Sequence, residues 1–155
     1  MKKIKLIVLT TMLAIGSASA QDYNTGIGIR GGLSNGLTVK HFIGENTALE
    51  GIFTSRWRGF SITGLYEINN NTKVDRLNWY YGVGAHVGFW NGSNVKWVND
   101  NKDYTVIGVD VILGLEYNFE KIPFNLSIDW KPAYNLVGHS GFWGDGGAIS
   151  FRYIF

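Results

Sequence analysis

The chain has 155 residues, with 14 basic side chains, 12 acidic side chains and no cysteine. Without cysteine it can form neither a disulfide framework nor a thiolate metal site. The first 20 residues hold three of the basic side chains and none of the acidic ones, which leaves 11 basic against 12 acidic residues in the rest of the chain. This near-neutral balance argues against nucleic acid as a partner.

Residues 1–20 have the features of a secretory signal peptide. Lys2, Lys3 and Lys5 precede a mostly apolar run over residues 4–15, and Ala18-Ser19-Ala20 offers a cleavage site of small residues. We therefore expect residues 1–20 to be cleaved on export and residues 21–155 to form a single domain. No later stretch approaches the roughly 18 consecutive apolar residues of a transmembrane helix.

Turn signals rich in Gly, Asn, Asp and Pro divide residues 21–155 into eight runs of alternating apolar and polar residues. The run over 104–119 alternates for sixteen positions. Strands of soluble domains peak at roughly 5–6 residues, whereas a tilted strand needs roughly 9–11 to cross a bilayer. The sequence therefore predicts an all-β fold, an eight-stranded antiparallel up-and-down transmembrane β-barrel. Its expected strands are 23–33, 36–43, 47–57, 60–68, 77–90, 104–119, 124–137 and 147–155.

The alternation gives each strand one apolar face and one face of small or charged residues. We expect the apolar face to meet lipid and the polar face to line the lumen. An eight-stranded barrel is only wide enough inside for side chains, so the charges are expected to pair and fill the lumen, without a wide pore. Ile52 and Leu65 are exceptions on the polar face. The expected lumen network consists of Arg30, Lys40, Glu50, Glu67, His86, Asp110, Glu116, Asp129, Lys131 and Arg152.

Aromatic residues cluster near the ends of the expected strands, as in the two girdles of transmembrane barrels. One group is Tyr23, Trp79, Tyr81, Tyr117, Phe119, Tyr153 and Phe155, and the other is Trp57, Phe60, Phe89, Trp90, Tyr104 and Tyr134. A secreted lipocalin-like carrier has the same periodicity with the two faces exchanged. It stays an alternative at this point.

The last residues, Ser150 to Phe155, carry aromatic side chains at alternate positions, Phe151, Tyr153 and Phe155. This ending resembles the C-terminal assembly signal of bacterial outer-membrane barrels. Together with the signal peptide and the eight strands, residues 21–155 resemble the small OmpX-like barrels and the transmembrane domain of OmpA. The resemblance implies a monomer in the outer membrane of a Gram-negative bacterium, in contact with membrane lipids and lipopolysaccharide. It also implies recognition by the barrel assembly machinery and a structural or surface-interaction role.

The last expected loop offers one enzymatic alternative. Nucleophilic catalysis needs a hydroxyl, a base and a group that orients the base, and His139, Ser140 and Asp145 supply these three residue types. Outer-membrane enzymes that modify lipid A, a deacylase or an acyltransferase, place His and Ser near the outer leaflet. Our main expectation is nevertheless a protein without enzymatic activity. Because the sequence has no metal-ligand spacing and no phosphate-binding glycine loop, we expect neither a metal nor a cofactor.

Overall fold

The computed structural model describes residues 23–155 apart from 34, 57, 92–101, 139 and 145. The expected signal peptide, residues 1–20, lies outside the described residues. The described part contains no helix that is both long enough and apolar enough to span a membrane. Its strands are β1 (Thr25–Gly32), β2 (Asn35–Phe42), β3 (Thr47–Arg56), β4 (Gly59–Asn71), β5 (Leu77–Asn91), β6 (Asp103–Asn118), β7 (Phe124–Trp130), β8 (Ala133–Val137), β9 (Gly141–Trp143) and β10 (Gly147–Ile154).

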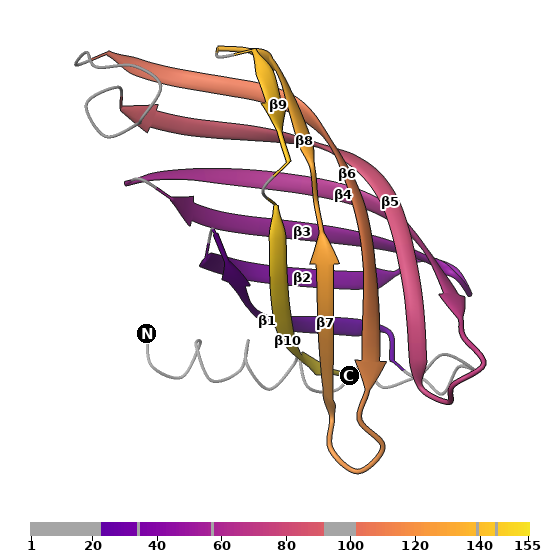
Figure 1. Ribbon diagram of the computed structural model, residues 1–155. Helices are drawn as coiled ribbons and strands as arrows, with labels where there is room; N and C mark the ends of the chain where they lie inside the picture. Colours follow the sequence, from indigo (N-terminus) through magenta and orange to yellow (C-terminus); the bar gives the residue numbers. More distant parts are fainter. Residues whose placement is uncertain (1–22, 34, 57, 92–101, 139, 145) are drawn as a thin grey trace, which may run out of the picture.

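These strands close into a ring (Figure 1). Each strand from β1 to β6 pairs antiparallel with the next, β6 pairs with β7, and β7 pairs with β10. The pairing of β10 with β1 completes the circle. β8 continues β7 along the edge of β6, and β9 precedes β10 on the same side. The ten segments thus fill eight positions, which confirms the predicted closed, eight-stranded antiparallel barrel.

The predicted seventh strand, 124–137, is interrupted where Pro132 separates β7 from β8. Proline has no N–H to donate to the neighbouring strand. The register is nevertheless kept across the gap, since Leu113 lies opposite Trp130 and Asp110 opposite Ala133. The backbone N–H of Val111 still donates to the carbonyl of Pro132, at 3.0 Å. The interruption is therefore local and leaves the wall of the barrel intact.

The fourth strand is longer than the sequence predicts. The run of asparagines after residue 68 indicated a turn, because Asn is depleted in strands. In the structure β4 continues to Asn71, and the connection to β5 is only residues 72–76. Asn69 is consequently a wall residue with a buried side chain, 6% exposed. Its amide oxygen accepts a hydrogen bond from Lys40, which explains why a polar residue is stable at this strand position.

The apolar face points away from the axis of the barrel. Along β6, Val109, Val111 and Leu113 are 46%, 53% and 50% exposed, whereas Asp110 and Glu116 are each 1% exposed. A lipocalin-like carrier requires the opposite orientation, with an apolar interior that holds the ligand. That alternative is therefore wrong.

The lumen also contains one apolar patch. Ile52, Leu65, Tyr80 and Ile112 come from the neighbouring strands β3 to β6 and form one buried cluster. Ile52 and Leu65, the two exceptions to the polar pattern, are thus part of an apolar cluster inside the barrel. Tyr80 requires a glycine on the adjacent strand, because a Cβ atom at Gly114 would lie 2.5 Å from its Cζ. Interior volume, and not polarity alone, selects the residues of this face.

We predict that Gly114→Ala destabilises the barrel by about 1–3 kcal/mol, the usual cost of overpacking a filled interior. The matched control is Gly64→Ala, because a Cβ atom at the outward-facing Gly64 meets nothing within 4 Å. The free energy of unfolding of both variants in detergent, followed by circular dichroism against urea, checks the prediction. Equal stability of the two variants would contradict the packing of Tyr80 against Gly114.

Candidate functional site

The structure separates the expected lumen network into two groups. Seven of its residues, Arg30, Lys40, Glu50, Glu67, Glu116, Asp129 and Arg152, lie in the interior and are each at most 5% exposed; with Tyr80 we call them the central cluster. The other three, His86, Asp110 and Lys131, lie toward the rim opposite the chain termini. Together with Asn135 they form what we call the rim cluster.

Arg152 of β10 is completely buried and is held by four side chains from three other strands. Its Nη2 donates to Oε1 of Glu50 at 2.5 Å. Its Nη1 donates to Ser127 Oγ at 2.8 Å and to Asn125 Oδ1 at 3.2 Å. Its Nε donates to Thr38 Oγ1 at 3.3 Å, and the Thr38 hydroxyl in turn donates to Glu50. All three nitrogens of the guanidinium group are therefore bonded, as a buried cation requires.

Lys40 of β2 is the second fully buried cation. Its ammonium group donates to Glu116 Oε2 at 2.9 Å and to Asn69 Oδ1 at 2.8 Å. Glu67 Oε2 lies 3.1 Å away as a second ion-pair partner. The ring centroid of Tyr80 is 4.1 Å from the same nitrogen, close enough for a cation–π interaction.

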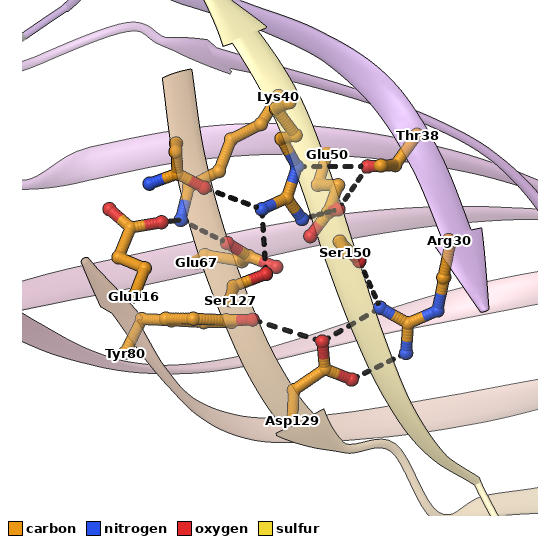
Figure 2. A network of polar contacts seen from close by, with 12 residues as sticks. Arg30, Thr38, Lys40, Glu50, Glu67, Tyr80, Glu116, Ser127, Asp129 and Ser150 are labelled. Carbon is orange, nitrogen blue, oxygen red and sulfur yellow. Dashed lines mark hydrogen bonds and ion pairs between the residues drawn. The ribbon is translucent and has the colours of Figure 1, made fainter. Parts of the chain in front are cut away.

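Arg30 of β1 forms a two-pronged pair with Asp129, in which each terminal nitrogen bonds a different carboxylate oxygen. Tyr80 also donates to Asp129, at 3.1 Å, and so joins this pair to the rest of the cluster. Figure 2 shows these side chains converging on the interior. Each of the eight positions in the ring contributes one member of the central cluster. The cluster therefore ties the whole circumference together and blocks the lumen with bonded side chains.

The charges of the central cluster do not balance. Its cations are Arg30, Lys40 and Arg152, and its carboxylates are Glu50, Glu67, Glu116 and Asp129, so there is one carboxylate too many. Glu67 is the weakest held of the four, because neither of its oxygens makes a hydrogen bond among the described residues. It also shares Lys40 with Glu116. Glu67 is thus the surplus acid of the cluster.

The rim cluster is built around Asp110 of β6, and both of its carboxylate oxygens are bonded. Lys131 Nζ lies 2.5 Å from one oxygen, and His86 Nδ1 lies 2.7 Å from the other. The second nitrogen of His86 contacts Asn135 Oδ1 at 3.0 Å. The imidazole is therefore fixed at both nitrogens and has no position left for a substrate proton.

Several interior residues were not among the expected network, and Tyr80, Asn69 and Tyr23 show why. Tyr80 lies between two outward aromatic residues, so strict alternation places it in the lumen and could have identified it. Asn69 was hidden by the turn signal of the asparagines around it. Tyr23 was expected in an aromatic girdle, but it is only 6% exposed, and its hydroxyl donates to Glu116 at 3.3 Å. The expected strand 23–33 placed it on the outward face, but β1 begins only at Thr25, so strand alternation does not apply to Tyr23.

The residues of the enzymatic alternative are only partly described. Ser140 is exposed beside β9, whereas His139 and Asp145 lie outside the described residues. In the described part of the chain, no three His, Asp or Glu side chains are placed to hold a metal ion. The grouping of His139, Ser140 and Asp145 into a catalytic site stays a prediction.

The residues of the expected assembly signal lie at the end of β10. Phe151 and Tyr153 point outward, with 40% and 39% exposure. Phe151 stacks on Phe124 with ring centroids 4.8 Å apart, and Tyr153 packs against Phe155 at 6.0 Å. The chain end is fixed to the first strand, because the backbone N–H of Phe155 donates to Thr25 at 2.9 Å. The aromatic ending is thus part of the outer surface near the termini.

Comparisons with models of protein families, with curated proteins and with solved structures found no match for this chain.

The surplus carboxylate predicts opposite effects for two similar substitutions. Glu50→Gln leaves Arg152 without its charged partner and should cost about 3–5 kcal/mol of unfolding free energy. Glu67→Gln removes the surplus charge and should leave stability unchanged or raise it, because Lys40 keeps Glu116 as a charged partner and the Glu67 oxygens accept no hydrogen bond from the described residues. Urea unfolding in detergent micelles, with both variants compared with the parent chain, measures the difference. If Glu67→Gln costs as much as Glu50→Gln, Glu67 is not the surplus acid.

Proposed function

We propose that this chain is a small integral β-barrel protein of the bacterial outer membrane, with a structural or surface-interaction role and a lumen closed to large solutes. The observation that carries the proposal is the distribution of polarity across the wall. The buried side holds charged side chains, and the exposed side holds large apolar ones. A protein folded in water has the opposite arrangement.

The apolar surface runs around the whole ring. Each of the eight positions carries a large apolar side chain that is at least 44% exposed: Ile29, Val39, Phe53, Ile62, Val83, Val111, Ile128 and Ile149. Contiguous apolar patches on soluble monomers seldom exceed a few hundred Å², and larger ones mark an interaction with a membrane or a partner. A belt that surrounds the barrel fits a lipid bilayer better than any single partner surface.

Aromatic pairs lie near both ends of this belt. Trp79 and Tyr81 stack at 5.4 Å on the side of the termini, and Phe60 and Phe89 pack at 5.2 Å on the opposite side. Aromatic rings are enriched at the two membrane–water interfaces. Their placement supports the proposed membrane location and the resemblance to OmpX-like barrels and the OmpA transmembrane domain.

The proposal includes the surroundings and the biogenesis of the protein. The belt would contact outer-membrane lipids and lipopolysaccharide, and the outward Phe151, Tyr153 and Phe155 would serve the barrel assembly machinery as a recognition signal. Residues 1–20 would direct export. We further propose that the protein acts as a monomer and has no enzymatic activity, because the polar side chains of the central cluster are bonded to one another.

A charge in the middle of the belt tests the membrane location. Val111→Arg should cost about 2–4 kcal/mol in lipid vesicles, the range for Arg at the bilayer midplane. The control is Val74→Arg, because Val74 is similarly exposed, at 59%, but lies in the turn between β4 and β5. The measurement is equilibrium unfolding in vesicles. If both substitutions are neutral, Val111 meets water and the proposal fails.

The closed lumen predicts the electrical behaviour of the barrel. In planar lipid bilayers the protein should insert without stable, large conductance steps, because the central cluster and the apolar patch fill the interior. Parallel addition of a known porin controls for insertion. Stable steps of porin size from this chain would show that the bonded side chains do not close the path.

A further inference from the structure

The interior is not filled over its whole length. A cavity of about 130 Å³ remains on the side of the rim cluster, beyond the central cluster. It is lined by the last residues of β3 and β5 and by β9, so it lies toward the rim opposite the chain termini. A space of this size has room for several water molecules or one small polar ligand.

Basic side chains outnumber acidic ones among the described lining residues of this cavity. Arg30, Arg56, Lys131 and His86 face it, and Asp110 is the one carboxylate among them. Arg30 is already paired with Asp129 of the central cluster. Both oxygens of Asp110 are already bonded within the rim cluster. Lys131 uses one of its three N–H groups on Asp110 and is 16% exposed, so it has donors left for a ligand. The described lining thus offers ammonium donors and no carboxylate oxygen that lacks a bond, which favours an anion over a cation.

Two tryptophan rings form part of the same lining. Trp90 faces inward from β5, although the sequence placed it in an aromatic girdle. Its indole N–H donates to the carbonyl of Arg56 at 3.1 Å, and its ring lies where a Cβ atom of Gly59 or Gly88 would approach within 2.1 Å. Trp143 of β9 is the second ring. The orientation of Trp90 is therefore fixed before any ligand arrives, which lowers the entropic cost of binding.

We propose that this cavity binds an anionic saccharide, a sugar ring that carries a phosphate or a carboxylate. Lys131 and Arg56 hold the anionic group through charge-assisted hydrogen bonds. The hydroxyls of Thr54 and Ser61, which bond each other at 2.8 Å and also line the cavity, meet the polar edge of the ring. The apolar face of the sugar packs on the tryptophan rings. The site goes beyond the proposed structural role and does not depend on it, because a free sugar phosphate can be offered in detergent.

Isothermal titration of the protein in detergent micelles with glucosamine 1-phosphate tests the site, with glucosamine and inorganic phosphate as comparison probes. Glucosamine 1-phosphate should bind most tightly, and the indole N–H resonances of Trp90 and Trp143 should shift.

Lys131→Met and Arg56→Met should each weaken binding at least about tenfold, the loss expected for one charge-assisted hydrogen bond. Arg56→Met leaves the rim cluster intact, so this variant still tests the site if Lys131→Met does not fold. Trp143→Ala should weaken glucosamine 1-phosphate but not inorganic phosphate.

The control substitution is Arg76→Met, because Arg76 lies in the turn between β4 and β5, at the other end of the barrel. It should leave the affinity unchanged. The proposal is overturned if glucosamine 1-phosphate does not bind, if glucosamine or inorganic phosphate binds equally well, or if Arg76→Met weakens binding as much as Arg56→Met.

A second arm identifies the source of the saccharide. The protein is placed in lipid nanodiscs with or without lipid A, whose headgroup is a phosphorylated disaccharide. If lipid A shifts the two indole signals and competes with glucosamine 1-phosphate, the ligand is a lipid headgroup. If only the soluble probe does so, the ligand is a free saccharide. Both results support an anionic saccharide site, and failure of both probes to shift the signals overturns it.

Discussion

Closing eight strands into a ring leaves a lumen about as wide as the side chains that fill it, and this width governs the interior chemistry. Little bulk water fits among such side chains, so every buried charge needs a partner within the protein. The three nitrogens of Arg152 and the ammonium of Lys40 meet this demand with partners from several strands. The same width explains why Gly114 faces Tyr80, since no other residue leaves space for that ring.

The interior changes character along the axis. In its central part the side chains are bonded to one another around the whole ring, and the bonds hold the strands in register. Toward the rim opposite the termini the packing ends, and a cavity remains between the rim cluster and the tryptophan rings. The stabilising network and the proposed binding site therefore occupy different sections of one lumen. The surplus carboxylate Glu67 belongs to the first section, and the donors of Lys131 and Arg56 belong to the second.

Alternation along the strands was sufficient to predict the fold class and the direction of most side chains, because side-chain direction in a strand depends only on position. Asp110 and Glu116 could be placed in the interior on this basis alone. The pairing could not be predicted. Lys40 meets Glu116 across 76 residues and Arg152 meets Glu50 across 102, and such contacts depend on the stagger between strands, which alternation does not encode. Tyr23 was misplaced because it lies before β1, where strand alternation does not set the direction of a side chain.

We propose that lipid, and not water, covers the apolar side of the wall. The chain has no cysteine, so single cysteines can be introduced along β6 and labelled with a nitroxide in lipid vesicles. Labels at odd positions from 107 to 115 should collide readily with dissolved oxygen, which concentrates in the bilayer, and hardly at all with a water-soluble nickel complex. A control label at position 74, in the turn between β4 and β5, should collide readily with the nickel complex. Ready collision of the odd-numbered labels with the nickel complex would show that water, and not lipid, covers this face.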